Sequence, residues 1–245
     1  MGWLSRTPPA RPFRLFGPAH VAAVAAVASG CVALGRLADA SPRTKKVVRR
    51  ALVGALWAQE LSFHAWRWRC GTWTVKEMVP LHACSLSVWL GGVGTLTGSR
   101  TINEFVYYLG FGGASQALLT PDLGPYGPPH YRFWQFFLSH GLLVALPAWQ
   151  VRAEGLRPTW ASAARSFGLL CAYAVPVYAV NRALGSNYCY VNRKPDTASI
   201  LDAMPPWPRY LPILAGIAGA AFALLTLPFE LGAAGERSGP DAAAS

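Results

Sequence analysis

Cys84 combines a reactive side chain with a position that would activate it. Pro80 suits the first turn of a helix, where no backbone N–H is needed, so the sequence predicts a helix that begins there. Cys84 would then lie about one turn inside the helix, where the positive end of the dipole favours a nucleophilic thiolate. A cysteine can also be a small apolar packing residue, an interpretation that suits Cys31 and Cys171 better.

A thiol nucleophile needs a base within hydrogen-bond reach. His82 lies two residues before Cys84, about 200° around the same helix, so it faces another direction. His140 lies at a similar depth in a later segment and is the candidate base. Asn181 is the candidate that orients the imidazole, as Asn does in some cysteine proteases. A histidine bonded only to a neighbouring helix is the structural alternative for His140.

The elements that must position these residues are seven apolar segments of about bilayer length. We therefore predict an all-α fold, a polytopic membrane helical bundle with seven transmembrane helices. Residues 1–16 would form an N-terminal tail, residues 17–231 the bundle and residues 232–245 a disordered C-terminal tail. The seven segments are residues 17–37, 48–66, 80–97, 103–120, 133–150, 164–184 and 210–230.

Composition supports a membrane location. Hydrophobic residues make up 53% of the 245 residues and charged residues only 13%, whereas a soluble domain carries about 25% charged residues. The net charge of +11 comes from Lys and Arg between the apolar runs, which suits phospholipid headgroups better than nucleic acid. We expect an integral membrane protein, in the plasma membrane of a bacterium or the endoplasmic reticulum of a eukaryote.

Counting the crossings brings many polar side chains to one side of the bilayer. Successive helices run in opposite directions, so the starts of odd-numbered segments and the ends of even-numbered segments share a side. Ionisable groups at membrane depth are costly and usually functional, although interfacial side chains can also reach outward to water. The substrate-binding candidates selected in this way are His20, Glu60, His64, His82, Gln116, Arg132, Tyr178 and Arg182.

Two other kinds of function fit a cavity lined by these polar side chains. Glu60 and His64 are four residues apart and share a helix face, so with His82 and His140 they could bind Zn²⁺ and activate water. The spacing matches no recognised zinc motif, and we assign no metal ligand and no cofactor. A non-catalytic lipid-binding or transport protein is the other alternative, because basic residues around an interfacial cavity suit a phosphate headgroup.

Several motifs resemble a known family. The sequence contains Pro80-Leu81-His82-Ala83-Cys84, Ser139-His140-Gly141, Gly185-Ser186-Asn187-Tyr188, Lys194-Pro195, Leu201-Asp202 and Trp207-Pro208. In this order they resemble the YwaF-like bacterial integral membrane proteins, which are similar to the animal transmembrane protein 164 type. The resemblance covers roughly residues 13–230. One departure is Pro205-Pro206 before Trp207, where the family pattern leads us to expect a glycine nearby.

The resemblance implies a seven-helix membrane protein. Through the animal branch it also implies a cysteine-dependent acyltransferase that remodels phospholipids, with Cys84 as the nucleophile and His140 as its partner. Asn187, within the third motif, joins the substrate-binding candidates. The predicted function is therefore a phospholipid acyltransferase or lipid ester hydrolase with an acyl-enzyme intermediate, whose partners are an acyl lipid and the bilayer.

Overall fold

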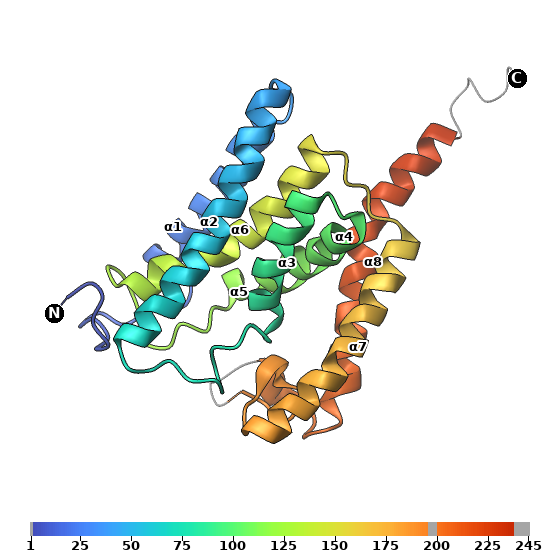
Figure 1. Cartoon of the computed structure of the whole chain (residues 1–245). Coiled ribbons are helices and arrows are strands. Elements are labelled where there is room, and N and C mark those ends of the chain that lie inside the picture. The colour runs from blue at the N-terminus through green and yellow to red at the C-terminus, as the bar shows by residue number, and fades with distance from the viewer. Residues whose placement is uncertain (1, 196–199, 238–245) are drawn as a thin grey trace, which may run out of the picture.

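The computed structural model describes residues 2–195 and 200–237, which form helices and no β-strand. This confirms the all-α prediction (Figure 1). Two short 3₁₀ turns, η2 (Tyr188–Tyr190) and η3 (Ile200–Ala203), lie between the last two helices. The longer elements are α1 (Pro18–Arg36), α2 (Pro42–Arg69), α3 (Ala83–Thr97), α4 (Arg100–Leu109), η1 (Gly110–Ala114), α5 (Ser115–Leu119), α6 (Tyr131–Ala153), α7 (Trp160–Leu184) and α8 (Tyr210–Arg237).

Local sequence signals explain where these helices begin and end. The Ser41 side chain accepts a backbone hydrogen bond at the start of α2, and Thr159 and Ser162 form a reciprocal capping box at the start of α7. Gly98 ends α3 with φ 70° and Gly185 ends α7 with φ 64°. Glycine adopts this left-handed conformation without the steric cost of a Cβ atom.

Several predicted boundaries are wrong, and α2 begins at Pro42, six residues before the predicted start at residue 48. Helix α3 begins at Ala83, with His82 as its N-cap, and not at Pro80. Cys84 is therefore the second residue of the helix and lies closer to the positive end of the dipole than predicted. Helix α8 continues to Arg237, so residues 232–237 are helical where a tail was predicted. The rest of that predicted tail, residues 238–245, lies outside the described residues.

The fourth predicted segment is one helical path that widens in the middle. It runs through α4, the π-helical turn η1 and α5. A Cβ atom at Gly110 would lie 2.3 Å from the carbonyl oxygen of Leu143 in α6. Glycine thus lets the two backbones meet, and the wider π turn forms at this point of contact. Such turns are often found near functional sites.

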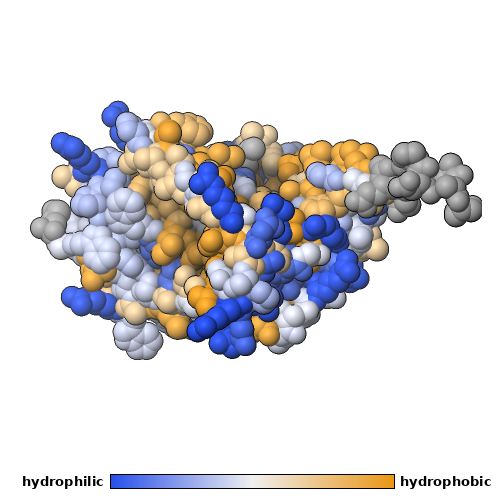
Figure 2. Space-filling view, turned by 90° about the horizontal axis from the view of Figure 1, so that it is seen from above, coloured by the Kyte–Doolittle hydropathy of each residue, from blue (hydrophilic) through white to orange (hydrophobic). Residues whose placement is uncertain are grey.

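Among the described residues, three helices are long and apolar enough to cross a membrane: α1, α7 and the span Tyr210–Ala233 within α8. Helix α3 is apolar but has only 15 residues. Large apolar side chains such as Val32 on α1 and Leu224 on α8 are exposed, and Figure 2 shows hydrophobic residues at the surface among hydrophilic ones. Contact with lipid would remove these apolar side chains from water.

Helix α6 is the centre of the bundle. It packs against α1, α2, α3, α4, η1 and α5, whereas α7 and α8 pair with each other at the side of the bundle (Figure 1). The largest buried side chain between α2, α3 and α6 is Trp149. The N-terminal segment also packs on this core, because backbone carbonyls of Trp3, Leu4 and Ser5 accept hydrogen bonds from residues of α2 and from His130-Tyr131.

Candidate functional site

Cys84 lies where three helices meet. It packs against a buried apolar cluster that includes Leu143 of α6 and Ala114 of the π turn. The next residue, Ser85, hydrogen bonds to Glu60 of α2. The negative charge of Glu60 also acts on the Cys84 thiol. Residues from α2, α3 and α6 therefore lie around the thiol.

Glu60 is a buried carboxylate within a polar network. Its side chain is only 5% exposed and also hydrogen bonds to Gln59. His64, one turn later, has Nε2 3.8 Å from Glu60 Oε1, and its Nδ1 accepts a hydrogen bond from the indole N–H of Trp73. The Arg132 guanidinium supplies an attractive positive charge. A buried carboxylate needs such partners to offset its desolvation.

Arg132, in the first turn of α6, joins the same network. Its Nη1 donates to Oε1 of Gln135 at 2.5 Å, and Gln135 Nε2 donates to Oε1 of Gln59 at 3.0 Å. The guanidinium carbon lies 4.7 Å from the ring centroid of Phe63 and 5.2 Å from that of Phe136. Two aromatic rings therefore hold the cation.

His140 is held in one orientation. Its Nδ1 lies 2.9 Å from the carbonyl oxygen of Phe136, and its ring stacks on the Phe136 ring at a centroid distance of 4.1 Å. Because a carbonyl only accepts, Nδ1 carries the proton and Nε2 carries the basic lone pair. Nε2 has no hydrogen-bond partner among the described residues. This is the tautomer that a general base requires.

His82 lies at the same end of α3 but belongs to a different set of contacts. Its Nδ1 accepts a hydrogen bond from the backbone N–H of Cys189 at 3.3 Å, and its ring packs against Tyr188 and Tyr190. Burial lowers the pKa of His82, and the Asp122 carboxylate opposes this shift. His82 is therefore neutral near pH 7, and it holds the loop after α7 against the start of α3.

Asn181 does not orient His140, so this prediction is wrong. Its Nδ2 donates to the carbonyl of Tyr188 and to Oδ1 of Asn192, and its Oδ1 accepts from Ser186 Oγ and the N–H of Tyr188. These four bonds use both donors and two acceptor sites of the amide. Asn181 is committed to the turn that follows α7, while the backbone of Phe136 orients His140 instead.

His20 and Gln116 lie apart from the thiol. His20 is 2% exposed; its Nε2 donates to the carbonyl of Leu118, and its Nδ1 accepts from the N–H of Phe16. Both ring nitrogens are thus used to join the N-terminal segment and α1 to α5. Gln116 is exposed and donates to Thr120 Oγ1. The predicted substrate-binding role of these two residues is not supported by their contacts.

The remaining three substrate-binding candidates lie around the loop after α7. Tyr178 stacks on Trp207 at a centroid distance of 6.4 Å, and Arg182 is exposed on the last turn of α7. Asn187 Nδ2 donates to the carbonyls of Arg193 and Lys194. The structure does not bring these three side chains to Cys84, because they shape or flank the loop.

Within residues 2–195 and 200–237, no three His, Cys, Asp or Glu side chains gather closely enough to hold a metal ion. Glu60 and His64 do pair. His82 and His140, however, turn their Nδ1 atoms to Cys189 and Phe136. The zinc-binding set considered from the sequence therefore does not assemble in this part of the chain.

Sequence reasoning missed four polar residues of the site. Three of them have only an indirect signal in the sequence: Gln59 precedes Glu60, Gln135 is one helical turn from Arg132, and Ser85 follows Cys84. Cys189 has no signal at all, because it reaches the start of α3 from a loop that is distant in sequence. Its thiol donates to the carbonyl of Leu81 at 3.1 Å.

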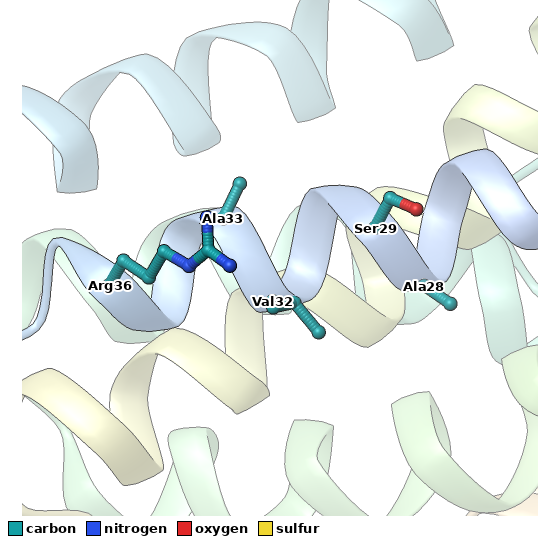
Figure 3. A pocket seen from close by; sticks show the side chains of 5 residues that line it. All are labelled: Ala28, Ser29, Val32, Ala33 and Arg36. Atoms are coloured by element: carbon teal, nitrogen blue, oxygen red, sulfur yellow. The ribbon is translucent and has the colours of Figure 1, made fainter.

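Two shallow surface hollows lie elsewhere. One, of about 370 Å³, follows an exposed face of α1 and is lined by Ala28, Ser29, Val32, Ala33 and Arg36 (Figure 3). The other, of about 470 Å³, lies between the N-terminal segment and the end of α2, beside Arg69 and Cys70. Neither hollow includes Cys84 or His140, and the lining of the first is mostly apolar.

Comparison with known proteins gives one match. A family model described as the TMEM164 family matches residues 15–226, a range that contains Cys84, His140 and the polar network around them. Neither the curated proteins nor the solved structures contain a match. The family match and the apolar helices α1, α7 and α8 identify an integral membrane protein. The family model covers most of the sequence, and the chain belongs to the TMEM164 family.

Proposed function

We propose that this protein is a membrane acyltransferase or lipid ester hydrolase that forms an acyl thioester on Cys84. The observation that carries the proposal is the fixed tautomer of His140. Its Nδ1 is bonded to the Phe136 carbonyl and its Nε2 has no partner among the described residues. His140 lies one turn before Leu143, a member of the apolar cluster on which Cys84 packs.

The proposed membrane arrangement is a bundle of seven spans over residues 17–231. Helices α1, α7 and α8 support it by their length and apolar composition, and α2, α3, α6 and the α4–η1–α5 path pack beside one another. With seven crossings, the end of α2, the start of α3 and the start of α6 share one face. The reaction would then take place near the headgroups of that leaflet.

The chemistry follows from the residue types. His140 Nε2 takes the proton of the Cys84 thiol, and the thiolate attacks the ester carbonyl carbon of the lipid. The carbon–oxygen ester bond breaks, and the departing lysolipid oxygen takes the proton back from His140. An alcohol acceptor, or water, then attacks the thioester and releases Cys84. This sequence needs no oxidant and no bound metal.

The start of α3 offers a stabilising group for this reaction. The first N–H groups of a helix have no intrahelical partner, and Cys84 and Ser85 are the second and third residues of α3. Their N–H groups would donate to the oxygen of the tetrahedral intermediate. The nucleophile and these donors would thus belong to the same helical turn.

Acyl transfer by purified protein in phospholipid nanodiscs tests this proposal. With a lipid carrying an isotope-labelled acyl chain, we expect Cys84→Ala and His140→Ala each to abolish transfer, and the wild type to carry a labelled, hydroxylamine-sensitive thioester at Cys84. Cys171→Ser is the matched control, because Cys171 is exposed on α7. Wild-type turnover by a folded Cys84→Ala variant would remove the mechanism.

Two further measurements separate the alternatives. Lipid binding or movement across the bilayer that survives Cys84→Ala, with no thioester in the wild type, would favour a lipid-binding or transport protein. Zinc that copurifies in a one-to-one ratio, and whose removal stops turnover, would favour a metal-dependent hydrolase.

A further inference from the structure

We propose that Arg67 and Arg132 together bind the phosphate group of the lipid. The identity of the ligand as a lipid rests on the proposed function, whereas the phosphate chemistry rests on the arrangement of the two guanidinium groups. Arg67 lies in the last turn of α2 and Arg132 in the first turn of α6. Arg67, unlike Arg132, is not among the residues selected from the sequence.

The two arginines lie close enough for their charges to interact. Phe63, on which the Arg132 guanidinium stacks, lies four residues before Arg67 and so on the same face of α2. The positive charge of Arg67 acts unfavourably on Arg132. Like charges at such a site cost free energy unless an anion lies between or beside them. The carboxylates of Asp122 and Glu60 offset part of this repulsion, and a bound oxyanion would offset it further.

Several N–H groups of this pair have no acceptor. The Nε of Arg67 is buried and has no hydrogen-bond partner among the described residues. Arg132 donates from Nη1 to Gln135, and the other N–H groups of its guanidinium have no hydrogen-bond partner among the described residues. A guanidinium presents five donors in a planar fork that matches the oxygens of a phosphate. A phosphate would satisfy donors of both residues at once.

The nearby carboxylates leave this position open. Glu77, whose side chain is 62% exposed, pairs with Nη2 of Arg67 and leaves Nε without a partner among the described residues. Glu60 and Asp122 act on Arg132 through their charge. No hydrogen bond or ion pair joins either carboxylate to Arg132 among the described residues. Nε of Arg67 and the guanidinium donors of Arg132 other than Nη1 therefore keep hydrogen-bonding capacity that a ligand could use.

The position of the pair fits a phospholipid whose ester lies at Cys84. Arg132, Phe136 and His140 are spaced by four residues along one face of α6. The Phe136 ring lies between the guanidinium and the imidazole, at centroid distances of 5.2 Å and 4.1 Å. A phosphate bound at Arg132 would place the glycerol ester a few bonds deeper along this face, toward His140. The headgroup phosphate would therefore select the lipid class.

Binding, without turnover, tests this inference. The full-length Cys84→Ser variant in detergent is titrated calorimetrically with dihexanoyl phosphatidic acid, with dihexanoylglycerol, which lacks the phosphate, and with inorganic phosphate. We expect the phosphatidic acid to bind at least about tenfold more tightly than the diacylglycerol. Adding Arg67→Gln or Arg132→Gln should weaken phosphatidic acid binding about tenfold and leave diacylglycerol binding unchanged. Arg182→Gln, on the exposed end of α7, is the control and should change neither.

Each outcome decides the matter. Equal affinity for the two lipids, or unchanged phosphatidic acid binding in folded Arg67→Gln protein, would overturn the inference. Binding of inorganic phosphate that is lost in both arginine variants supports the site. If phosphatidic acid binds no more tightly than inorganic phosphate, the site is assigned to free phosphate. Because Arg67 is partly exposed, Arg67→Gln remains informative if Arg132→Gln does not fold. Loss of turnover in a variant that still binds phosphatidic acid bears on the Cys84 mechanism alone.

Discussion

The contact between Gly110 and Leu143 predicts a large difference between two glycine substitutions in one helical turn. In Gly110→Ala the new Cβ atom would lie 2.3 Å from the Leu143 carbonyl oxygen and 3.2 Å from Cγ of Pro147. A backbone oxygen cannot yield without moving α6, so we expect an overpacking cost of about 3 kcal/mol. The better helix preference of alanine returns about 1 kcal/mol. The net loss is about 2 kcal/mol of unfolding free energy.

Gly113→Ala is the matched control. It lies in the same π turn, and a Cβ atom there meets open space, so this variant should gain about 1 kcal/mol from helix preference alone. The two variants should therefore differ by about 3 kcal/mol in unfolding free energy. Reversible unfolding by SDS in mixed micelles, followed by circular dichroism, measures this difference. Equal stabilities, or a stabilised Gly110→Ala protein, would refute the role given to the contact.

Two further predictions concern the loop after α7. Asn181→Ala should lower the unfolding free energy by about 3 kcal/mol in the same SDS titration, because it leaves the N–H and C=O groups of Tyr188 without their partners. The control is Asn187→Ala, in a more exposed part of the loop. A loss for Asn181→Ala that is no larger than the loss for Asn187→Ala would contradict this prediction. Burial lowers the pKa of His82 in the folded protein, so the unfolded chain binds more protons and stability should fall as the pH drops below about 6.5, by at most about 1.4 kcal/mol per pH unit. His82→Gln should reduce this loss between pH 7.5 and 5.5, and an unchanged slope would show that other groups cause it.

Much of the fold could be predicted because helix periodicity and apolar length are local properties of a sequence. Each of the seven apolar segments overlaps a helical segment, although the bounds differ by up to seven residues. Pro80 is a good first residue of a helix, so the sequence predicts a start of α3 that is three residues too early. In the structure His82 accepts a hydrogen bond from the Cys189 backbone and is the N-cap of α3, with extended backbone angles. A contact with a segment more than 100 residues away decides that boundary.

The candidate site was predicted in part for a similar reason. The depth of a residue in the bundle follows from its position along its helix, and this reasoning predicts that Glu60 and Cys84 lie at a similar depth. Direction around a helix and the identity of the bonding partner cannot be counted in this way. His20 and Asn181 have suitable depth, yet backbone groups of Leu118 and Tyr188 take up their hydrogen-bonding capacity. Arg67 has no distinguishing signal in the sequence, because arginines at a helix end, such as Arg67 and Arg69, usually face headgroups.

The hydrogen bonds of Tyr188 have a consequence for the biogenesis of the protein. The Tyr188 hydroxyl donates to the carbonyl of Val75 and accepts from the N–H of Val79. The segment just before α3 is therefore covered by a residue that is synthesised more than 100 residues later. During synthesis, α3 would enter the membrane long before this cover exists. A chain that stops before Tyr188 would carry Cys84 and His140 with the thiol end of α3 still uncovered. Ribosome-bound chains of increasing length should therefore acquire protection of Cys84 from alkylation only after the residues around Tyr188 have emerged.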